Sequence, residues 1–174
     1  MSRPAVAVDY DHDGICQAEF RKAMSNFPTG VAVLTAAENG TRYGMTVNSL
    51  TSVSLTPSLL LVCPKKGSST GEALKRTGRF AVNILSADQE DVCKRFAGEH
   101  APRFEGLEEV EERDALPLLP NSLVHLICEV YAVHPAGDHD IVVGRVTQGQ
   151  VAAGDPLLFH QGSLTHHRRE SAWK

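Results

Sequence analysis

The most informative stretch of this sequence runs from Gly44 to Leu55, GMTVNSLTSVSL, and a second stretch, CPKKGSSTGE, follows from Cys63 to Glu72. Both windows concentrate small polar or basic side chains between apolar runs that we expect in the core. These positions are Thr46, Asn48, Ser49, Thr51, Ser52 and Ser54 in the first window, and Lys65, Lys66, Ser68, Ser69 and Thr70 in the second. Together they suggest a binding site for a flat, phosphorylated ligand.

Composition limits the classes of protein to consider. A chain of 174 residues with 42% hydrophobic and 22% charged side chains is typical of one globular domain. A net charge of −4 argues against nucleic acid as a partner. No apolar run approaches the roughly 20 residues needed to cross a bilayer, and residues 1–14 lack the apolar segment of a signal peptide. We therefore expect a protein with no membrane partner.

The cysteines and histidines do not have the spacing of a metal site. Cys16, Cys63, Cys93 and Cys128 are widely separated, so we interpret them as free thiols in a reducing cytoplasm. The pair His166 and His167 has no third ligand nearby and is expected in a polar tail, residues 166–174. We expect no metal and a cytoplasmic protein.

The pattern of apolar residues predicts a mainly β protein. Alternation with period two and enrichment in β-branched residues predict strands at Val31–Ala36, Arg42–Val47, Leu50–Leu55, Leu59–Cys63, Phe80–Leu85, Leu123–Val133, Asp140–Ala152 and Leu157–His160. Because strands dominate and no β-α-β alternation is present, a small antiparallel barrel is favoured over a Rossmann sheet.

Short helices are expected between the strands. Cys16–Ser25 is one candidate. Ser69 to Glu72 fits a capping box with Ser69 as the N-cap, and Gly78 would end that helix; Ser86 to Gln89 repeats the signature before a helix that ends at Gly98. Residues 99–121 are predicted to be a long surface excursion. Residues 1–14 are predicted to be a flexible leader before one domain, residues 15–165.

Three features could carry chemistry. Two lysines before the helix at Ser69 would make a phosphate site, although a capping box with two solvated lysines explains the same residues. The hydroxyl side chains at 46–54 could bind a ligand or could be an ordinary exposed strand face. His139 lies in a polar turn, where a histidine is either solvated or in contact with a cofactor. The Rossmann GxGxxG, P-loop, HExxH and GxSxG motifs are absent.

Several ordered blocks resemble the flavin reductase-like family, the short-chain NAD(P)H:flavin oxidoreductases. They are FPTGVAVLT from Phe27, GMTVNSLTSVSLTPSLLLVCPKK from Gly44, GRFAVNIL from Gly78, RFAG from Arg95, RF at Arg103 and GDH from Gly137. The resemblance covers about residues 17–164. It implies an FMN-binding split β-barrel of the antiparallel Greek-key type, a homodimer, and a flavin near the dimer interface.

The resemblance also implies which residues form the site. Thr46, Val47, Asn48, Ser49, Ser52 and Ser54 would lie on the isoalloxazine and ribityl side, and Cys63, Pro64, Lys65, Lys66, Ser68, Ser69 and Thr70 on the phosphate side. Ala97, Gly98 and Arg103 match positions that approach the flavin, and His139 matches a histidine that contacts nicotinamide. The segment 159–164 departs from the family pattern, with leucine and histidine where relatives often carry tyrosine and arginine.

The implied activity is hydride transfer from NADH or NADPH to FMN or FAD. The reduced flavin would pass to a partner flavin-dependent monooxygenase. Such a reaction needs orientation and electrostatics rather than a protein nucleophile. The alternative is a flavin- or haem-binding protein on the same split barrel that performs no turnover, because a fold does not determine a function.

Overall fold

The protein is described here by a computed structural model, which describes residues 14–98, 103–107 and 110–166. The expected leader, residues 1–14, falls almost entirely outside the described residues, and so does the expected tail apart from its first residue. That first residue, His166, is the last residue of a strand, Ser163–His166.

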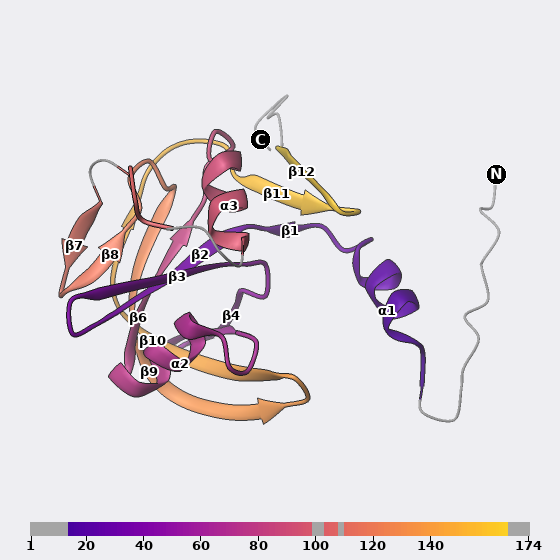
Figure 1. The fold of residues 1–174 in the computed structure, drawn as a ribbon, viewed down its shortest axis with the longest axis horizontal. Coiled ribbons are helices and arrows are strands. Elements are labelled where there is room, and N and C mark those ends of the chain that lie inside the picture. The colour runs from indigo at the N-terminus through magenta and orange to yellow at the C-terminus, as the bar shows by residue number, and fades with distance from the viewer. Residues whose placement is uncertain (1–13, 99–102, 108–109, 167–174) are drawn as a thin grey trace.

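A seven-stranded antiparallel sheet forms the body of the molecule, which confirms the prediction of a mainly β fold (Figure 1). The strand order is β3-β2-β6-β9-β10-β5-β4. The bounds are β2 Ala32–Glu38, β3 Thr41–Val47, β4 Thr51–Leu55, β5 Ser58–Val62, β6 Arg79–Ile84, β9 Val124–Ala136 and β10 His139–Val151. Strands β5 and β6 are consecutive in the chain but are separated in the sheet by β9 and β10, a crossover of the Greek-key kind.

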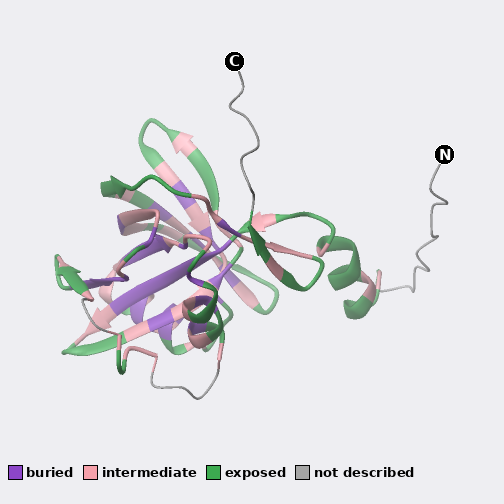
Figure 2. Ribbon diagram, turned by 90° about the horizontal axis from the view of Figure 1, so that it is seen from above, coloured by how far each residue is buried: buried purple, intermediate pink, exposed green. Residues whose placement is uncertain are grey.

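The sheet curls around a core that several strands and one helix share. Phe80, Val82, Cys128 and Val142 are fully buried there, next to Leu74 of helix α2, Ser69–Thr77. These residues come from alternate positions of β6, β9 and β10, so their side chains lie on one face of the sheet. Figure 2 shows the buried segments gathered at the centre of the molecule.

The prediction of a surface excursion at residues 99–121 is wrong for its second half. Strands β7, Glu111–Arg113, and β8, Leu116–Leu118, pair as a hairpin, and Leu116 and Leu118 pack on Ala81 and Ile127. The hairpin thus buries Ala81 of β6 and Ile127 of β9 on the face opposite Phe80 and Cys128. The apolar run 116–119 forms this cover because removing leucine side chains from water stabilises the folded protein.

Helix α3, Glu90–Ala97, begins three residues later than predicted, because its N-cap is Gln89 rather than Ser86. The Gln89 side chain accepts a hydrogen bond from the Ser86 backbone N–H at 3.0 Å and donates one to the Pro120 carbonyl at 2.8 Å. The bond from the Ser86 N–H is one half of the predicted capping box, but residues 86–89 form a turn ahead of the helix, and Gln89 rather than Ser86 is the N-cap. The predicted end at Gly98 is confirmed, because Gly98 is the C-cap.

Glycine at position 44 allows α3 to lie close to β3. A methyl group on Gly44 would overlap the ring of Phe96, which is 1% exposed and packs edge-on against Phe104 with 5.1 Å between ring centroids. The close approach brings α3 against the end of β3, where the polar stretch begins.

The remaining elements lie at one side of the sheet. Strands β1, Thr29–Gly30, β11, Leu157–His160, and β12, Ser163–His166, form a small sheet, of which β1 and β12 were not predicted. Helix α1, Gln17–Met24, agrees with the predicted helix and has no buried residue. Figures 1 and 2 show α1 standing away from the sheet, with a mostly exposed surface.

Candidate functional site

A pocket of about 680 Å³ opens where β3 ends. Its walls come from β3, α3 and the β11–β12 hairpin, and its lining residues are Val31, Thr46, Val47, Asn48, Glu90, Cys93, Lys94, Ala97, Phe159, Gly162, Ser163 and Leu164. Four of the residues predicted for the site, Thr46, Val47, Asn48 and Ala97, meet here although they are as much as 51 positions apart in the sequence, from 46 to 97.

A second, more apolar pocket of about 950 Å³ adjoins the first and shares Asn48, Phe159 and Gly162 with it. It contains Ser49 and Cys63, which were predicted for the site, and also the apolar side chains Phe20, Met24 and Phe27 around α1. The two pockets form one recess along the connection from β3 to β4.

Two hydroxyl groups in this recess stabilise the protein's own structure. Thr46 Oγ1 donates to the Cys93 carbonyl at 2.7 Å and joins β3 to α3. Ser49 Oγ accepts from the Cys63 backbone N–H at 3.0 Å and joins the β3–β4 connection to the end of β5. These bonds position the recess. The burial of Cys63 raises the pKa of its thiol, although the hydrogen bond from Ser49 opposes this effect.

The second polar window forms the loop that enters α2, but its capping differs from the prediction. Ser68, rather than Ser69, is the N-cap, because Ser68 Oγ accepts from the Gly71 N–H at 3.3 Å. Glu72 accepts from the Gly67 N–H at 3.3 Å instead of reaching the cap residue. Gly67 has a φ of 75° and makes the turn that shifts the cap by one residue.

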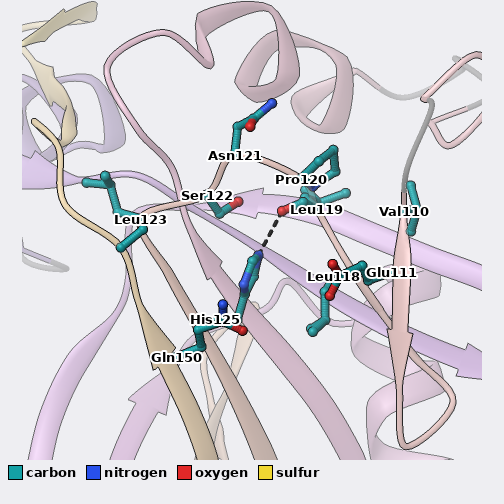
Figure 3. A pocket seen from close by; sticks show the side chains of 11 residues that line it. Val110, Glu111, Leu118, Leu119, Pro120, Asn121, Ser122, Leu123, His125 and Gln150 are labelled. Atoms are coloured by element: carbon teal, nitrogen blue, oxygen red, sulfur yellow. Dashed lines mark hydrogen bonds between the residues drawn. The ribbon is translucent and has the colours of Figure 1, made fainter.

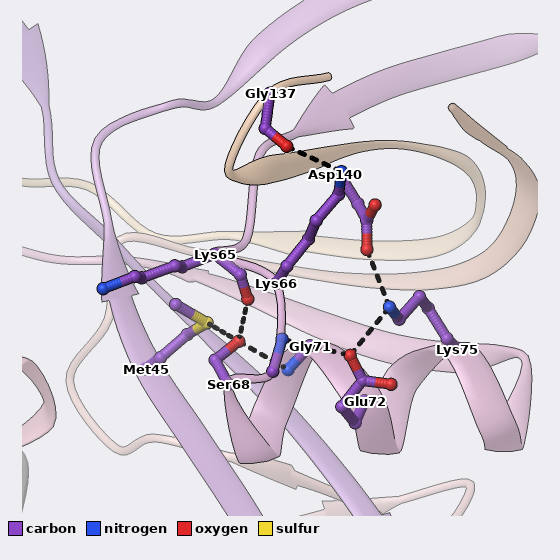
Figure 4. A network of polar contacts seen from close by, with 10 residues as sticks. Met45, Lys65, Lys66, Ser68, Gly71, Glu72, Lys75, Gly137 and Asp140 are labelled. Atoms are coloured by element: carbon purple, nitrogen blue, oxygen red, sulfur yellow. Dashed lines mark hydrogen bonds and ion pairs between the residues drawn. The ribbon is translucent and has the colours of Figure 1, made fainter. Parts of the chain in front are cut away.

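His139 lies beside this loop, although more than seventy positions separate it from Lys65 in the sequence. Lys65 and His139 pair as an isolated antiparallel bridge, and the Lys66 ammonium donates to the Gly137 carbonyl at 2.6 Å (Figure 4). His139 Nδ1 donates to Asp138 at 2.8 Å, and this hydrogen bond lowers the pKa of the Asp138 carboxyl. The loop and the turn therefore form one polar surface.

The other predicted residues take varied positions. Ser52 and Ser54 lie on β4 and line neither pocket, and Ser54 Oγ accepts from the Thr56 N–H at 3.2 Å. Arg103 donates to the carbonyls of Gly98 and Gly44, so it holds the segment after α3 against β3. Pro64 and Thr70 are buried, which makes them supports of the loop.

Sequence reasoning missed several residues around the recess. Phe159, Gly162, Ser163 and Leu164 line the first pocket from the β11–β12 hairpin, and Glu90 and Lys94 line it from α3. The spacing of Glu90 and Lys94 was a readable signal, because residues four apart on a helix can form the ion pair that is found here at 2.8 Å. Nothing in the local sequence of the hairpin indicated that it lines a pocket together with the end of β3.

A third pocket, about 540 Å³, lies among β8, β9 and β10 (Figure 3). None of the residues predicted for the site lines it, and His125 Nε2 donates across it to the Leu119 carbonyl at 2.7 Å. Among the described residues, no cluster of three metal-binding side chains occurs, and no helix is long and apolar enough to cross a membrane.

Comparison with known proteins decides the family. The sequence model of one protein family, the flavin reductase like domain, matches residues 24–167 of this chain. This chain belongs to the flavin reductase-like family. Family membership confirms the flavin reductase barrel expected from the sequence.

Individual relatives agree with this assignment. An NADH-dependent flavin reductase from a Rhodococcus species is 44% identical over 151 residues, which are 83% of this chain and 82% of that protein. The reductase subunit HsaB of a flavin-dependent monooxygenase from Rhodococcus jostii strain RHA1 is 36% identical over 160 residues, which are 88% of this chain and 82% of that protein.

A solved structure of the family superimposes on this chain. It is the NADH:FAD oxidoreductase SgcE6 of Streptomyces globisporus C-1027, in complex with NAD and FAD fragments. Its TM-score is 0.87 at 31% identity, and the match covers 95% of this chain and 100% of that chain.

The corrected cap of α2 in this family member is directly testable. Ser68→Ala removes the acceptor of the Gly71 N–H, so we expect the free energy of unfolding in urea to fall by about 1 kcal/mol without ligand. Ser69→Ala is the matched control, because Ser69 is exposed and lies inside the helix; its effect should stay within about 0.5 kcal/mol. A larger loss from Ser69→Ala than from Ser68→Ala would contradict the assignment.

Proposed function

We propose that the chain is an NAD(P)H:flavin oxidoreductase that transfers a hydride to FMN or FAD and supplies the reduced flavin to a separate monooxygenase component. The observation that carries this proposal is the recess at the end of β3, in a chain 44% identical to an NADH-dependent flavin reductase. The partner monooxygenase is supported by the relative that is a reductase subunit of such an enzyme.

The residues of the recess fit a flavin. Val47, Phe159 and Leu164 offer apolar walls to a flat ring system, and Asn48 supplies a polar group where the two pockets meet. Each pocket lies within the range of roughly 300–1,000 Å³ that is common for cofactor sites. Lys65 and the positive end of α2 suit a phosphate group, because the first amides of a helix have no partners inside it.

A bound flavin would supply the ring that accepts the hydride, and the chain's own residues would orient the two ring systems. Lys66 is held by the Gly137 carbonyl, so it supports the turn as well as adding positive charge. His139 uses Nδ1 to donate to Asp138, which fixes the plane of the imidazole ring. We propose that the other edge of this ring contacts the nicotinamide nucleotide.

Turnover tests the proposal against the alternative of a binding protein. We expect that mixing the protein anaerobically with excess NADH and free FMN bleaches flavin absorbance over many catalytic cycles. NADPH, FAD and haem should be assayed in parallel, to identify the preferred donor and acceptor. A stable stoichiometric complex with flavin or haem, without bleaching, would instead establish a non-catalytic binding protein.

His139 should serve the nicotinamide nucleotide more than the flavin. We expect His139→Ala to raise KM for NADH by about tenfold, equivalent to the loss of one charge-assisted hydrogen bond, and to leave the flavin Kd within about twofold. Steady-state kinetics and flavin titration measure the two effects. His134→Ala is the matched control, because His134 is an exposed histidine on the same hairpin. Unchanged kinetics of His139→Ala at limiting NADH would make His139 a solvated turn residue.

We also propose a homodimer in the cytoplasm. The dimer is supported by the exposed apolar residues of α1 and the turn after it, with Phe20 57%, Met24 51% and Phe27 66% exposed in the single chain. These three residues also line the larger pocket, so a second copy that covers them would complete the recess. The cytoplasmic location is supported by Cys16, Cys63, Cys93 and Cys128, which are all free thiols.

Sedimentation measures the oligomeric state. We expect a species of twice the 18.8 kDa chain mass at micromolar concentration, and we expect Phe20→Ser with Met24→Ser to shift it toward the single chain. Replacing Leu55, an 88% exposed leucine on β4, by serine tests whether the effect is specific to α1. A wild-type protein that sediments only as an 18.8 kDa species would contradict the dimer.

A further inference from the structure

One buried carboxylate joins two parts of the site that are far apart in the sequence. Asp140, next to His139, is 6% exposed, and its Oδ2 atom lies 2.7 Å from the Lys75 ammonium on α2. Lys75 also donates to Glu72 at 2.8 Å, and Glu72 accepts from the Gly67 N–H (Figure 4). The network therefore runs from the β9–β10 turn through α2 to the loop that begins α2.

The alternation of β10 explains why this carboxylate points inward. Asp140, Val142 and Gly144 are buried, whereas His139, Ile141 and Val143 on the opposite face are partly exposed. A charge at an inward position is costly unless it is paired, and Lys75 supplies the pair. Asp140 is the first side chain of this row, so the ion pair lies at the end of the core, next to the turn.

The turn has a second attachment to the same loop. The Lys66 N–H donates to the Asp138 carbonyl at 3.0 Å, and the Asp140 N–H donates to the Pro64 carbonyl at 3.0 Å. The Lys66 ammonium also donates to the Gly137 carbonyl, so several bonds join the turn to the loop. The ion pair between Asp140 and Lys75 joins the end of the turn to α2 as well, an element that none of these other bonds reaches.

We propose that Lys75 and Asp140 are positioning residues that hold His139 and the loop Lys65–Ser68 in one arrangement for ligand binding. The inference rests on the proposed function, because the ligand it concerns is the nicotinamide nucleotide. Without the ion pair the turn adopts several orientations, and the apparent affinity falls in proportion to the fraction that can bind. Hydride transfer within the bound complex is largely retained.

Kinetics of isosteric variants test the role. We expect Asp140→Asn and Lys75→Met each to raise KM for NADH by about tenfold while kcat stays within about twofold. Lys75→Arg keeps the charge and should restore most of the affinity. Glu38→Gln is the matched control, because it removes a different ion pair of α2, between Arg76 and Glu38, without touching the turn; its KM should not change. An unchanged KM in both Asp140→Asn and Lys75→Met overturns the proposal, as does an equal rise in Glu38→Gln.

A double variant tests whether Asp140 acts through His139. If it does, Asp140→Asn adds little to the KM of His139→Ala, because contacting residues that act as a unit are not additive. If the full effect of Asp140→Asn persists in the His139→Ala background, Asp140 does not position His139 and the proposal is wrong.

Amide hydrogen exchange of the full chain provides a readout that needs neither NADH nor flavin. We expect faster exchange in Asp140→Asn and Lys75→Met in peptides covering residues 63–70 and 134–142, with unchanged exchange in β2 and β6. Unchanged exchange in the first two peptides overturns the inference even if the wild-type protein reduces flavin. A wild-type protein that shows the exchange effect but no turnover contradicts the proposed function and leaves the structural coupling established.

Discussion

The antiparallel ladder between β9 and β10 is the constraint on which the rest of the structure depends. It pairs twelve positions, from His139 with Ala136 at one end to Val151 with Val124 at the other. A slip of one residue would turn Asp140, Val142 and Gly144 outward and remove the space that the Phe80 ring occupies over Gly144. The same register places the turn that contains His139 beside the loop that begins α2.

The site is built so that most of its polar groups already have partners. The hydroxyls of Thr46, Ser49 and Ser68 bind backbone atoms, and Arg103 binds two carbonyls. Such bonds hold strand ends and loops in place without a ligand, which reduces the ordering cost of binding. The groups that remain exposed, among them Lys65 and Asn48, are then the ones suited to contact a ligand directly.

The sequence predicted much of this correctly because the evidence was local. Alternation identified the barrel strands, and the turn composition around Gly137 identified the hairpin that presents His139. The errors also had local causes. Two adjacent serines, Ser68 and Ser69, are equally good N-caps by composition, and only the turn at Gly67 selects the first. At Ser86 the predicted bond to the Gln89 side chain is present, but the helix begins only after Gln89, whose amide also donates to Pro120, a partner distant in the chain.

By itself, the sequence determined the fold class, the position of most strands and the two polar windows, since alternation and capping depend on residues within a few positions of one another. Only the tertiary structure decided which of those residues meet. It brought Asn48 together with Phe159 and His139 together with Lys65, and it gave Asp140 its partner on α2. These contacts depend on sheet order and register, which arise from pairing between distant segments and leave no local pattern in the sequence.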